Sequence, residues 1–457
     1  MMKVAVIGAG AAGLCAARHI LSCPGFCPPV VFELSHEVGG TWCYDERIGT
    51  NDGRPIHSSM YRDLRTNLPK EVMMFPDFPF DPQLRSFIPH QEVQRYLEKY
   101  CQNHHIWPHI RFNTVVEKVE PVVVTTAEET RATWEVTSSD SSGCQKTETF
   151  DSVFVCTGHY SDPHIPDIPG IHNFKGQVLH SHSYRFPEPF SGRSVVVLGA
   201  KASGLDISME LAEAGAQVTL SHRHPPLSFP LPAGIQESSS IVAFEDDGRI
   251  CFQDGSVGGA DVLIFCTGYN YRFGFLDGAQ LGVDIQDEVL LGLYRLMMPP
   301  GFPSLFFIGM CKLILPFPNF HCQVFCAFLL HLQPPGVSGV ELDVGFFQLL
   351  SSLQVQFALA VLDGSVVLPP RAQMEEEAQL ALQEKEERGV ERRHLLVLQQ
   401  DQWEYCRALA QSAGFSPIPP VIRSLYEEVW RQRRIHPKNY RRTNYRLVSD
   451  TEWQVVD

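Results

Sequence analysis

Glycines at a fixed spacing mark the first place where this sequence could bind a cofactor. In KVAVIGAGAAG (residues 3–13) an apolar strand leads directly into Gly8, Gly10 and Gly13. Gly8 permits a tight bend, Gly10 lets the backbone approach a pyrophosphate, and Gly13 lets the next helix pack against the strand. The start of that helix offers unpaired backbone N–H groups to phosphates. The predicted contacts in this turn are Gly8, Ala9, Gly10, Ala11, Ala12 and Gly13.

A carboxylate and a second glycine turn follow at the expected spacing. The apolar strand PPVVFEL ends in Glu33, 20 residues beyond the last of these glycines, where a carboxylate would accept both ribose hydroxyls. In EVGGTW (residues 37–42) paired glycines permit another close approach to a long cofactor. We assign Gly40, Thr41 as a donor, and Trp42 as an apolar wall to this cofactor rather than to a surface turn.

The same pattern begins again in VLGAKASG (residues 197–204), with one residue out of place. Gly199 keeps the bend, Gly204 keeps the close helix packing, and Ser203 offers a hydroxyl. Lys201 stands where the middle glycine is expected, so the closest backbone approach is lost. We interpret this turn as a loosened nucleotide site, not as one that has lost its nucleotide.

The ends of the two second strands indicate which nucleotide each turn binds. AQVTLSHR carries Ser221 and Arg223 where the first unit carries Glu33. A carboxylate repels a 2′-phosphate, whereas a hydroxyl and a guanidinium bind it. The first site is therefore predicted to take FAD and the second to take NADPH. A chain that holds two dinucleotides usually passes a hydride from one to the other.

These elements predict an α/β fold with two dinucleotide-binding (Rossmann-like) domains, the NADPH domain being inserted into the FAD domain. Each unit closes with an apolar strand that ends in Thr-Gly, SVFVCTG (152–158) and DVLIFCTG (261–268), expected to lie beside the cofactor. The Pro-rich segment DPHIPDIPG (162–170) is the expected crossing. The expected limits are 1–165 for the first part of the FAD domain, 166–270 for the NADPH domain, and 271–457 for the return to the FAD domain with a helical C-terminal region.

Composition excludes several classes of protein. The chain has 457 residues, 44% of them hydrophobic, and a net charge of -15, which disfavours nucleic acid as a partner. We interpret the basic run RQRRIHPKNYRR (431–442) as a solvated helix face and turn. No apolar stretch is long enough to span a membrane, and the first strand leaves no room for a signal peptide. Thirteen cysteines without paired spacing indicate a reducing, cytoplasmic location, and no metal site is expected.

Four further motifs are distributed along the chain between residues 61 and 320. They are FKGQVLHSHSY (174–184), with Phe174, Gly176, His180 and Tyr184, then YRDLRTNLPKEVMMFPDFPF (61–80), CTGYN (266–270), and LFFIGM with PFPNF (305–320). In this combination the chain resembles the flavin-containing monooxygenases, most closely the plant-type S-oxygenating branch and its animal relatives.

The resemblance implies a reaction and the residues that serve it. NADPH would reduce FAD, the reduced flavin would bind O2 as a C4a-hydroperoxide, and one oxygen atom would pass to a sulfide sulfur or amine nitrogen of a small molecule. Asn67 matches the family asparagine beside the reactive edge of the flavin, and Thr66 is assigned to cofactor binding. His180 is expected to align the domains, not to move protons. A homodimer is left open.

Two features leave other interpretations open. Residues 325–355 interrupt the family pattern and suggest an in-frame insertion such as a retained intron, with a genuine surface excursion as the alternative. This segment or Lys201 could make the chain a catalytically impaired flavin-binding protein or an NADPH oxidase. A Baeyer–Villiger monooxygenase is disfavoured because its signature ends in Trp, where this chain has Tyr184. A disulfide reductase is disfavoured because no reactive cysteine pair follows the first glycine turn.

Overall fold

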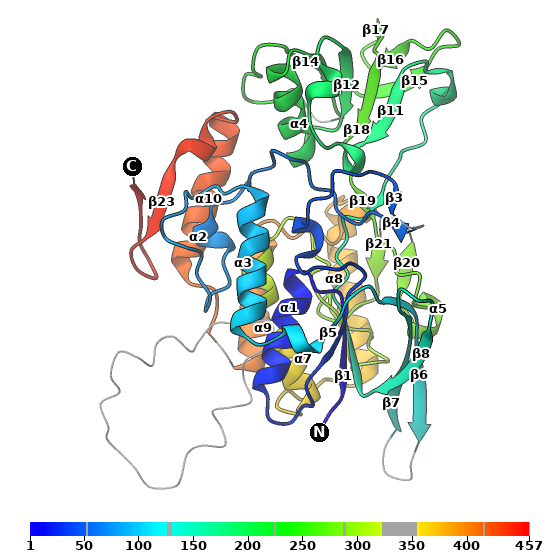
Figure 1. The fold of residues 1–457 in the computed structure, drawn as a ribbon, viewed down its shortest axis with the longest axis vertical. Coiled ribbons are helices and arrows are strands. Elements are labelled where there is room, and N and C mark those ends of the chain that lie inside the picture. Colours follow the sequence, from blue (N-terminus) through cyan, green and yellow to red (C-terminus); the bar gives the residue numbers. More distant parts are fainter. Residues whose placement is uncertain are drawn as a thin grey trace.

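The two repeated sequence units fold into two parallel sheets, placed one above the other along the long axis of the molecule (Figure 1). The computed structural model describes residues 1–51, 54–125, 130–223, 225–286, 289–321, 354–414 and 416–456. The suspected insertion at 325–355 therefore lies outside the described residues, except for positions 354 and 355 at the start of a helix.

The first sheet has five parallel strands in the order β22-β9-β1-β2-β5. Its strands are β1 (Val4–Ile7), β2 (Val30–Phe32), β5 (Ile110–Arg111), β9 (Ser152–Val155) and β22 (Leu305–Phe307). Helix α1 (Ala11–Ser22) connects β1 to β2, and helix α3 (His90–Asn103) precedes β5. Because β22 follows the second unit in sequence, the first sheet is completed only after the chain returns from that unit.

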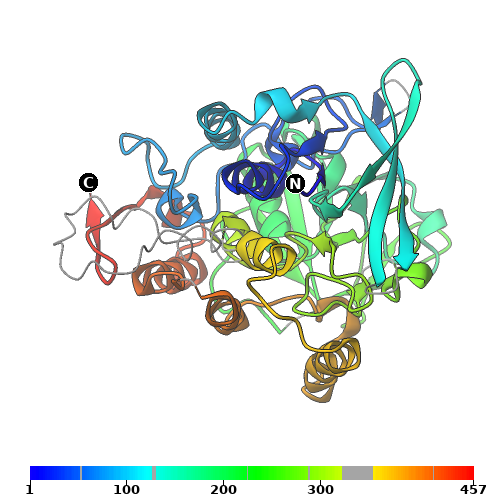
Figure 2. The same cartoon turned by 90° about the horizontal axis from the view of Figure 1, so that it is seen from below.

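Side chains of β1 alternate between two buried faces, as the period of two along a strand requires. Val4 and Val6 pack with helices α1 and α3. Ala5 and Ile7 pack against an antiparallel meander on the other face. The meander consists of β6 (Val115–Thr125), β7 (Thr130–Ser139) and β8 (Gln145–Phe150), and Figure 2 shows it on the side away from α1 and α3. Burial on both faces explains why the strand sequence is continuously apolar.

The second sheet repeats this plan, with the strand order β11-β18-β12-β13-β14. Its strands are β11 (Gln177–His180), β12 (Ser194–Leu198), β13 (Gln217–Ser221), β14 (Ile235–Ser238) and β18 (Val262–Phe265). Val195 and Val197 face helix α4 (Ala202–Glu213), whereas Val196 faces a second small antiparallel sheet. That sheet consists of β15 (Ile241–Phe244), β16 (Ile250–Phe252) and β17 (Val257–Gly258). The strands that precede the two Thr-Gly pairs, β9 and β18, pair with β1 and β12.

The chain passes between the two units twice, and the two connections run side by side. β10 (Asp162–Pro163), at the start of the predicted crossing, pairs antiparallel with β19 (Tyr269–Asn270), which follows β18. Two adjacent connections are what the insertion of one domain into another requires. The predicted fold class, two Rossmann-like domains with the second inserted into the first, is therefore confirmed.

The C-terminal region is mostly helical, as expected, and ends in a hairpin beside helix α10 (Figure 1). The remaining elements are β3 (Thr50–Asn51), β4 (Arg54–Pro55), α2 (Lys70–Met73), α5 (Gly278–Leu281), β20 (Asp284–Gln286), β21 (Val289–Leu291), α6 (Pro316–His321), α7 (Gln354–Leu362), α8 (Arg371–Glu387), α9 (Asp401–Ala413), α10 (Pro420–Ile435), β23 (Asn444–Leu447) and β24 (Trp453–Val456). In the described part of the chain, every helix is too short or too polar to cross a bilayer.

The basic run 431–442 is only partly the solvated face and turn that its sequence predicts. Arg431 lies at the surface and pairs with Glu428 on α10. Arg441 instead turns inward and pairs with Asp206 of α4, so for this residue the prediction is wrong. A charge on one helix that finds a partner on a distant element cannot be identified from the local charge pattern.

Candidate active site

The first glycine turn adopts the geometry that its sequence predicts. Gly8 has a φ of 105°, and a Cβ atom there would lie 2.6 Å from the carbonyl oxygen of Cys156. A Cβ on Gly13 would lie 1.8 Å from the carbonyl oxygen of Gly8, so helix α1 can approach the strand only without a side chain here. Helix α1 has no side-chain cap at Gly10 and no acidic residue in its first turn. The N–H groups of its first turn, which includes Ala11 and Ala12, are therefore available to phosphate.

Glu33 lies at the end of β2, buried beside the first turn. Its Oε2 accepts a 2.7 Å hydrogen bond from the backbone N–H of Ala9, and its Oε1 accepts bonds from the backbone N–H and hydroxyl of Ser35 at 2.8 and 2.7 Å. A carboxylate offers about four acceptor positions, of which these bonds use three. Glu33 can therefore accept one ribose hydroxyl directly, and a second one only if Ser35 turns away.

The EVGGTW segment packs directly on this turn. The backbone N–H of Gly39 donates to the carbonyl oxygen of Ala9 at 3.1 Å. A Cβ atom on Gly40, whose φ is 58°, would lie 3.0 Å from the Cα of Gly10. Side chains at these positions would push the two backbones apart, so both glycines allow the two segments to pack closely, and their approach to a cofactor stays a prediction.

Thr41 and Trp42 follow in a short 3-10 helix, Gly40–Trp42. The hydroxyl oxygen of Thr41 lies 3.4 Å from that of Ser59. The Trp42 ring meets Phe317 of α6 edge to face, with 6.4 Å between ring centroids. Trp42 thus packs against the apolar core of the first domain, and the Thr41 hydroxyl contacts Ser59.

Thr66 and Asn67 differ in whether their side chains form hydrogen bonds within the protein. Thr66 is buried, and its hydroxyl oxygen accepts a bond from the backbone N–H of Ile88 at 3.2 Å. Asn67 is half-buried, and its amide makes no hydrogen bond to any of the residues described. An asparagine that served only the turn before Leu68 and Pro69 would bond to nearby main chain. The Asn67 amide is therefore able to meet a ligand.

The second glycine turn repeats the close backbone contacts of the first at its two outer glycines. Gly199 has a φ of 114°, and a Cβ there would lie 2.5 Å from the carbonyl oxygen of Cys266. A Cβ on Gly204 would lie 1.7 Å from the carbonyl oxygen of Gly199. Ser203 is exposed in the first turn of α4, which also lacks a side-chain cap and an acidic residue. The turn therefore keeps the positive helix end that binds a pyrophosphate.

Lys201 is the N-cap residue of α4, and its side chain is exposed. Its Nζ lies 3.0 Å from Nε2 of His394, in the 3-10 helix Arg392–His394 of the returning chain. A glycine here would let the backbone approach a pyrophosphate closely. Lysine instead places a flexible cationic side chain toward the first domain.

The structure separates the two residues that the sequence assigns to the 2′-phosphate. Ser221 is 0% exposed, and its hydroxyl donates a 2.6 Å bond to the carbonyl oxygen of Ser239. The Arg223 side chain is 61% exposed, with its Nη2 3.9 Å from a carboxylate oxygen of Glu391. Ser221 ends a strand inside a parallel sheet, so its side chain is enclosed, whereas Arg223 has already left the strand. Only Arg223 is accessible to a phosphate.

The histidines near the domain crossing are poor proton carriers. Burial lowers the pKa of His159 to about 3 and, with the charge of His182 adding to the effect, that of His180 to about 4. Both rings are neutral at physiological pH, so they orient groups by hydrogen bonds. The Nδ1 of His180, for example, accepts a bond from the backbone N–H of His182 at 3.0 Å.

Cysteine chemistry is also disfavoured beside the two turns. Burial raises the pKa of the Cys43, Cys156 and Cys266 thiols, the last to about 12. A thiolate is the reactive form of cysteine, so none of these is poised as a nucleophile. Within the described ranges, the cysteines are free and no cluster of ligands could hold a metal ion.

Two buried polar atoms at the end of β9 indicate that this edge of the sheet receives a ligand. The Thr157 hydroxyl and Nε2 of His159 have no hydrogen-bond partner among the described residues. Buried polar atoms normally have one, and the carboxyl ends of parallel strands are where such folds bind cofactors. Together with the uncapped helix and the Gly10–Gly40 approach, these atoms fit a flavin dinucleotide.

Arg441 and His394 are not among the site residues predicted from the sequence. Arg441 bonds to Asp206 and to the carbonyl oxygen of Thr66, and His394 contacts Lys201. Each contact joins segments far apart in the chain, and no local motif marks either residue.

Two dinucleotide-binding turns, with the second domain inserted into the first, are typical of oxidoreductases that use two dinucleotide cofactors. A family described as "Flavin-binding monooxygenase-like" matches residues 1–227. The Arabidopsis thaliana protein "Flavin-containing monooxygenase FMO GS-OX4" is 34% identical over 473 residues, spanning 99% of this chain and 92% of that protein.

Two solved structures of similar sequence have the same fold as this chain. S-allyl-L-cysteine S-oxygenase from Allium sativum superposes with a TM-score of 0.82 at 33% identity, covering 96% of this chain and 94% of that one. Tmm from Pelagibacter sp. superposes with a TM-score of 0.79 at 28% identity, covering 100% and 96%. The chain belongs to the flavin-binding monooxygenase-like family. It is an NADPH-dependent flavin monooxygenase with FAD and NADPH as cofactors, and the resemblance to the S-oxygenating branch is confirmed.

Proposed function

We propose that this enzyme transfers one oxygen atom from O2 to a soft nucleophile, a sulfide sulfur or an amine nitrogen, of a small molecule. The observation that carries the proposal is Asn67, a half-buried amide without a partner in the described structure, directly after Thr66, whose carbonyl oxygen accepts a hydrogen bond from Arg441. The name of the relative S-allyl-L-cysteine S-oxygenase supports sulfur as the acceptor.

Some of the predicted site residues would bind the cofactors, and Asn67 would act on the reacting oxygen. The turn at Gly8–Gly13 and Glu33 would hold FAD, and the turn at Gly199–Gly204 with Arg223 would hold NADPH. The bound flavin supplies the oxygen-activating chemistry. The Asn67 amide both donates and accepts hydrogen bonds without giving up a proton, so it can orient the reacting oxygen without protonating it.

The surroundings support a site that keeps protons away from the reaction. The neutral rings of His159 and His180 cannot act as acids near pH 7, because burial holds their pKa values far below that range. Trp42 and Phe317 place aromatic surface beneath the first turn, where it limits the access of water.

We extend the proposal to organisation and location. We propose the domain limits 1–165, 166–270 and 271–457, and the paired connections β10 and β19 near the two borders support them. A cytoplasmic enzyme would keep its cysteines reduced, in accord with the free cysteines of the described segments.

The test uses the purified full chain. FAD content is read from absorbance, and NADPH oxidation under 18O2 is measured with an aryl methyl sulfide, with N,N-dimethylaniline and with a cyclic ketone. We expect one sulfoxide or N-oxide, carrying one 18O, for each NADPH oxidised. Hydrogen peroxide as the sole product would identify an NADPH oxidase, and a yellow protein that leaves NADPH intact would be an impaired flavin-binding protein. A labelled lactone from the ketone would identify a Baeyer–Villiger enzyme.

A further inference from the structure

Arg441 connects two segments that belong to different domains. It lies in the 3-10 helix Tyr440–Arg442, between α10 and β23. Its Nη1 and Nη2 donate to the two carboxylate oxygens of Asp206 on α4, at 3.2 and 2.5 Å. Its Nε donates to the carbonyl oxygen of Thr66 at 3.0 Å. One planar guanidinium therefore holds the NADPH-domain helix and the residue before Asn67 at once.

This contact is shielded from solvent. The side chains of Arg441 and Asp206 are only 19% and 14% exposed. Bidentate arginine–carboxylate pairs combine charge with a fixed geometry, and salt screens enclosed pairs much less than surface pairs. The pair is thus able to fix relative positions, which most surface ion pairs do not.

Thr66 is itself held firmly, so that its carbonyl is a fixed point. Its backbone N–H donates to the carbonyl oxygen of Ile88 at 2.9 Å, and its hydroxyl oxygen accepts from the N–H of Ile88. The neighbouring Ser86 is bound by the C-terminal hairpin, through the side chain of Asn444 and the backbone of Tyr445. Arg441 and the segment that it contacts are therefore anchored by the same C-terminal element.

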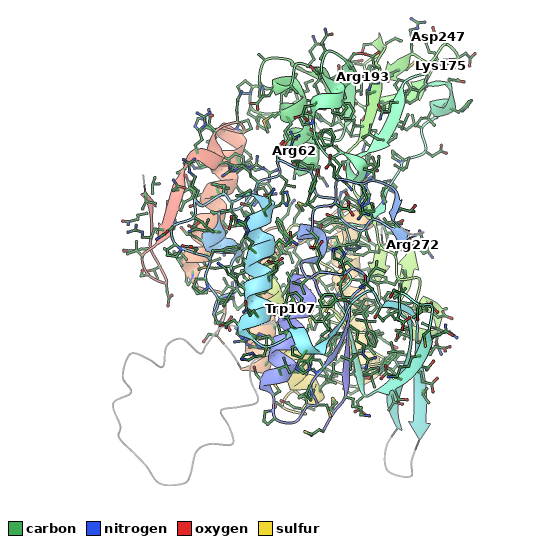
Figure 3. The ribbon with its side chains drawn as sticks, in the orientation of Figure 1. Arg62, Trp107, Lys175, Arg193, Asp247 and Arg272 are labelled. Carbon is green, nitrogen blue, oxygen red and sulfur yellow. The ribbon has the colours of Figure 1, made fainter. Side chains whose placement is uncertain are left out.

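Other links also join the segment 61–67 to the second domain: the backbone N–H of Arg62, for example, donates to the carbonyl oxygen of Arg185 at 2.8 Å. Tyr61 donates to Asp206 at 3.3 Å. Arg62 pairs with Glu188 at 2.6 Å, but both side chains are largely exposed, and Figure 3 shows Arg62 at the surface where the two domains meet. Solvent and salt screen the Arg62 pair, and the Arg62–Arg185 bond does not reach α4. Among the described residues, Arg441 is the side chain that bonds both to α4 and to the residue next to Asn67.

We propose that Arg441 is a positioning residue that keeps Asn67 in register with α4, and hence with the nicotinamide nucleotide whose phosphates α4 binds. The proposal rests on the proposed function of Asn67. A displacement of about 1 Å at a reacting centre can cost about 100-fold in rate, so a fixed link between the two domains has a direct catalytic consequence. Lysine cannot replace this link, because a single ammonium lacks the planar fork that reaches both partners.

The test compares Arg441→Lys and Asp206→Asn with Arg442→Lys as the matched control. Arg442 is the adjacent exposed arginine, and its guanidinium makes no hydrogen bond or ion pair with the residues described. The measurements are FAD content, thermal unfolding, backbone hydrogen exchange of peptides 61–67 and 202–213 with and without NADP+, and the ratio of oxygenated product to NADPH consumed.

Both test variants should retain FAD and unfold cooperatively. Exchange in peptide 61–67 should become faster by about 10- to 100-fold, the loss expected for a charge-assisted contact. Protection of this peptide by NADP+ should disappear, and more of the NADPH should be spent on hydrogen peroxide. Arg442→Lys should match the wild type in every measurement.

Two results would overturn the proposal. One is unchanged exchange in peptide 61–67 in both folded variants, and the other is a uniform rise in exchange across the whole chain, which would indicate a merely structural role. If the wild-type enzyme itself oxygenates no sulfide or amine, the proposed function fails, whereas the exchange measurements still decide whether Arg441 links the domains.

Discussion

Nζ of Lys201 and Nε2 of His394 lie 3.0 Å apart across the boundary between the two domains. Burial, together with the nearby charge of Lys201, lowers the pKa of His394 below its usual value, so the ring is neutral at pH 7 and accepts a hydrogen bond from the ammonium. The residue that departs from the glycine pattern thus contacts the first domain. Its charge lies at the rim of the nucleotide turn, not within it.

Replacing Lys201 tests how the absence of the middle glycine affects NADPH binding. Lys201→Gly would restore the closest backbone approach to a pyrophosphate, so we expect the KM for NADPH to fall or stay unchanged in steady-state assays. Lys175→Ala, at an exposed lysine on the outer end of the second domain (Figure 3), serves as the control. A large rise in KM for Lys201→Gly alone would show that the ammonium binds the nucleotide directly.

Asn67→Ala should separate NADPH consumption from oxygenation. Removing one preorganised hydrogen-bonding group beside a reacting atom costs about 100- to 1,000-fold in rate, so product should fall by that factor while FAD binding and NADPH oxidation persist. Asn103→Ala, at the exposed end of α3, controls for the loss of an amide. Product and hydrogen peroxide are measured together, and unchanged oxygenation would remove Asn67 from the site.

Arg223 should determine the preference for NADPH over NADH. A charge-assisted contact to the 2′-phosphate is worth about 1.5 to 3 kcal/mol, so Arg223→Ala should lower kcat/KM for NADPH by about 10- to 100-fold and leave NADH nearly unaffected. Arg249→Ala is the control, since Arg249 is an exposed arginine paired within its own hairpin. Equal losses with both nucleotides would mean that Arg223 does not recognise the phosphate.

Replacing Ser221, the other residue assigned to the 2′-phosphate, should not change the preference for NADPH over NADH. Its hydroxyl is buried and bonded to Ser239, so Ser221→Ala should lower the stability by about 1 kcal/mol without changing the nucleotide preference.

Gly13 should be intolerant of any side chain. A Cβ atom at this position would lie 1.8 Å from the carbonyl oxygen of Gly8, which is backbone and cannot move aside without opening the turn. We expect Gly13→Ala to lower the free energy of unfolding by about 3 kcal/mol or more and to lose FAD. Gly25→Ala is the matched control, because a Cβ there meets nothing within 4 Å. Equal urea midpoints for the two variants would contradict this account.

Glu210 should make stability depend on pH. Burial raises the pKa of this carboxyl from 4.5 to about 7, even though Tyr184 donates a 2.8 Å hydrogen bond to it. The folded state then binds more protons than the unfolded state between these values, so the free energy of unfolding falls as pH rises from about 4.5 to about 7. Asp206 and Asp63 add to the shift, and Arg441 opposes it.

Glu210→Gln should remove this dependence. The variant should be more stable than the wild type at pH 8, and the difference should shrink at pH 5, as measured by urea unfolding. Glu213→Gln, exposed on the same helix and paired with Lys438, should show no such trend. A wild type whose stability is flat between pH 5 and pH 8 would contradict the raised pKa.

The sequence alone was sufficient to predict both nucleotide turns and the inserted-domain plan. Gly8, Gly13, Gly199 and Gly204 are required by steric contacts within a few residues of themselves or with the adjacent strand, so their spacing carries the information. The strands were readable because burial on both faces requires continuous apolar runs.

The tertiary structure decided which polar side chains remain available and which distant residues meet. Ser221 and Arg223 are equivalent ligands in the sequence, but the sheet encloses one and leaves the other exposed. Arg441 and Asp206 are 235 residues apart, and their pairing depends on where α10 and α4 come to lie. The conformation of a glycine turn depends on local steric contacts, so the sequence predicts it. A contact between domains depends on how whole elements pack, so no local sequence pattern predicts it.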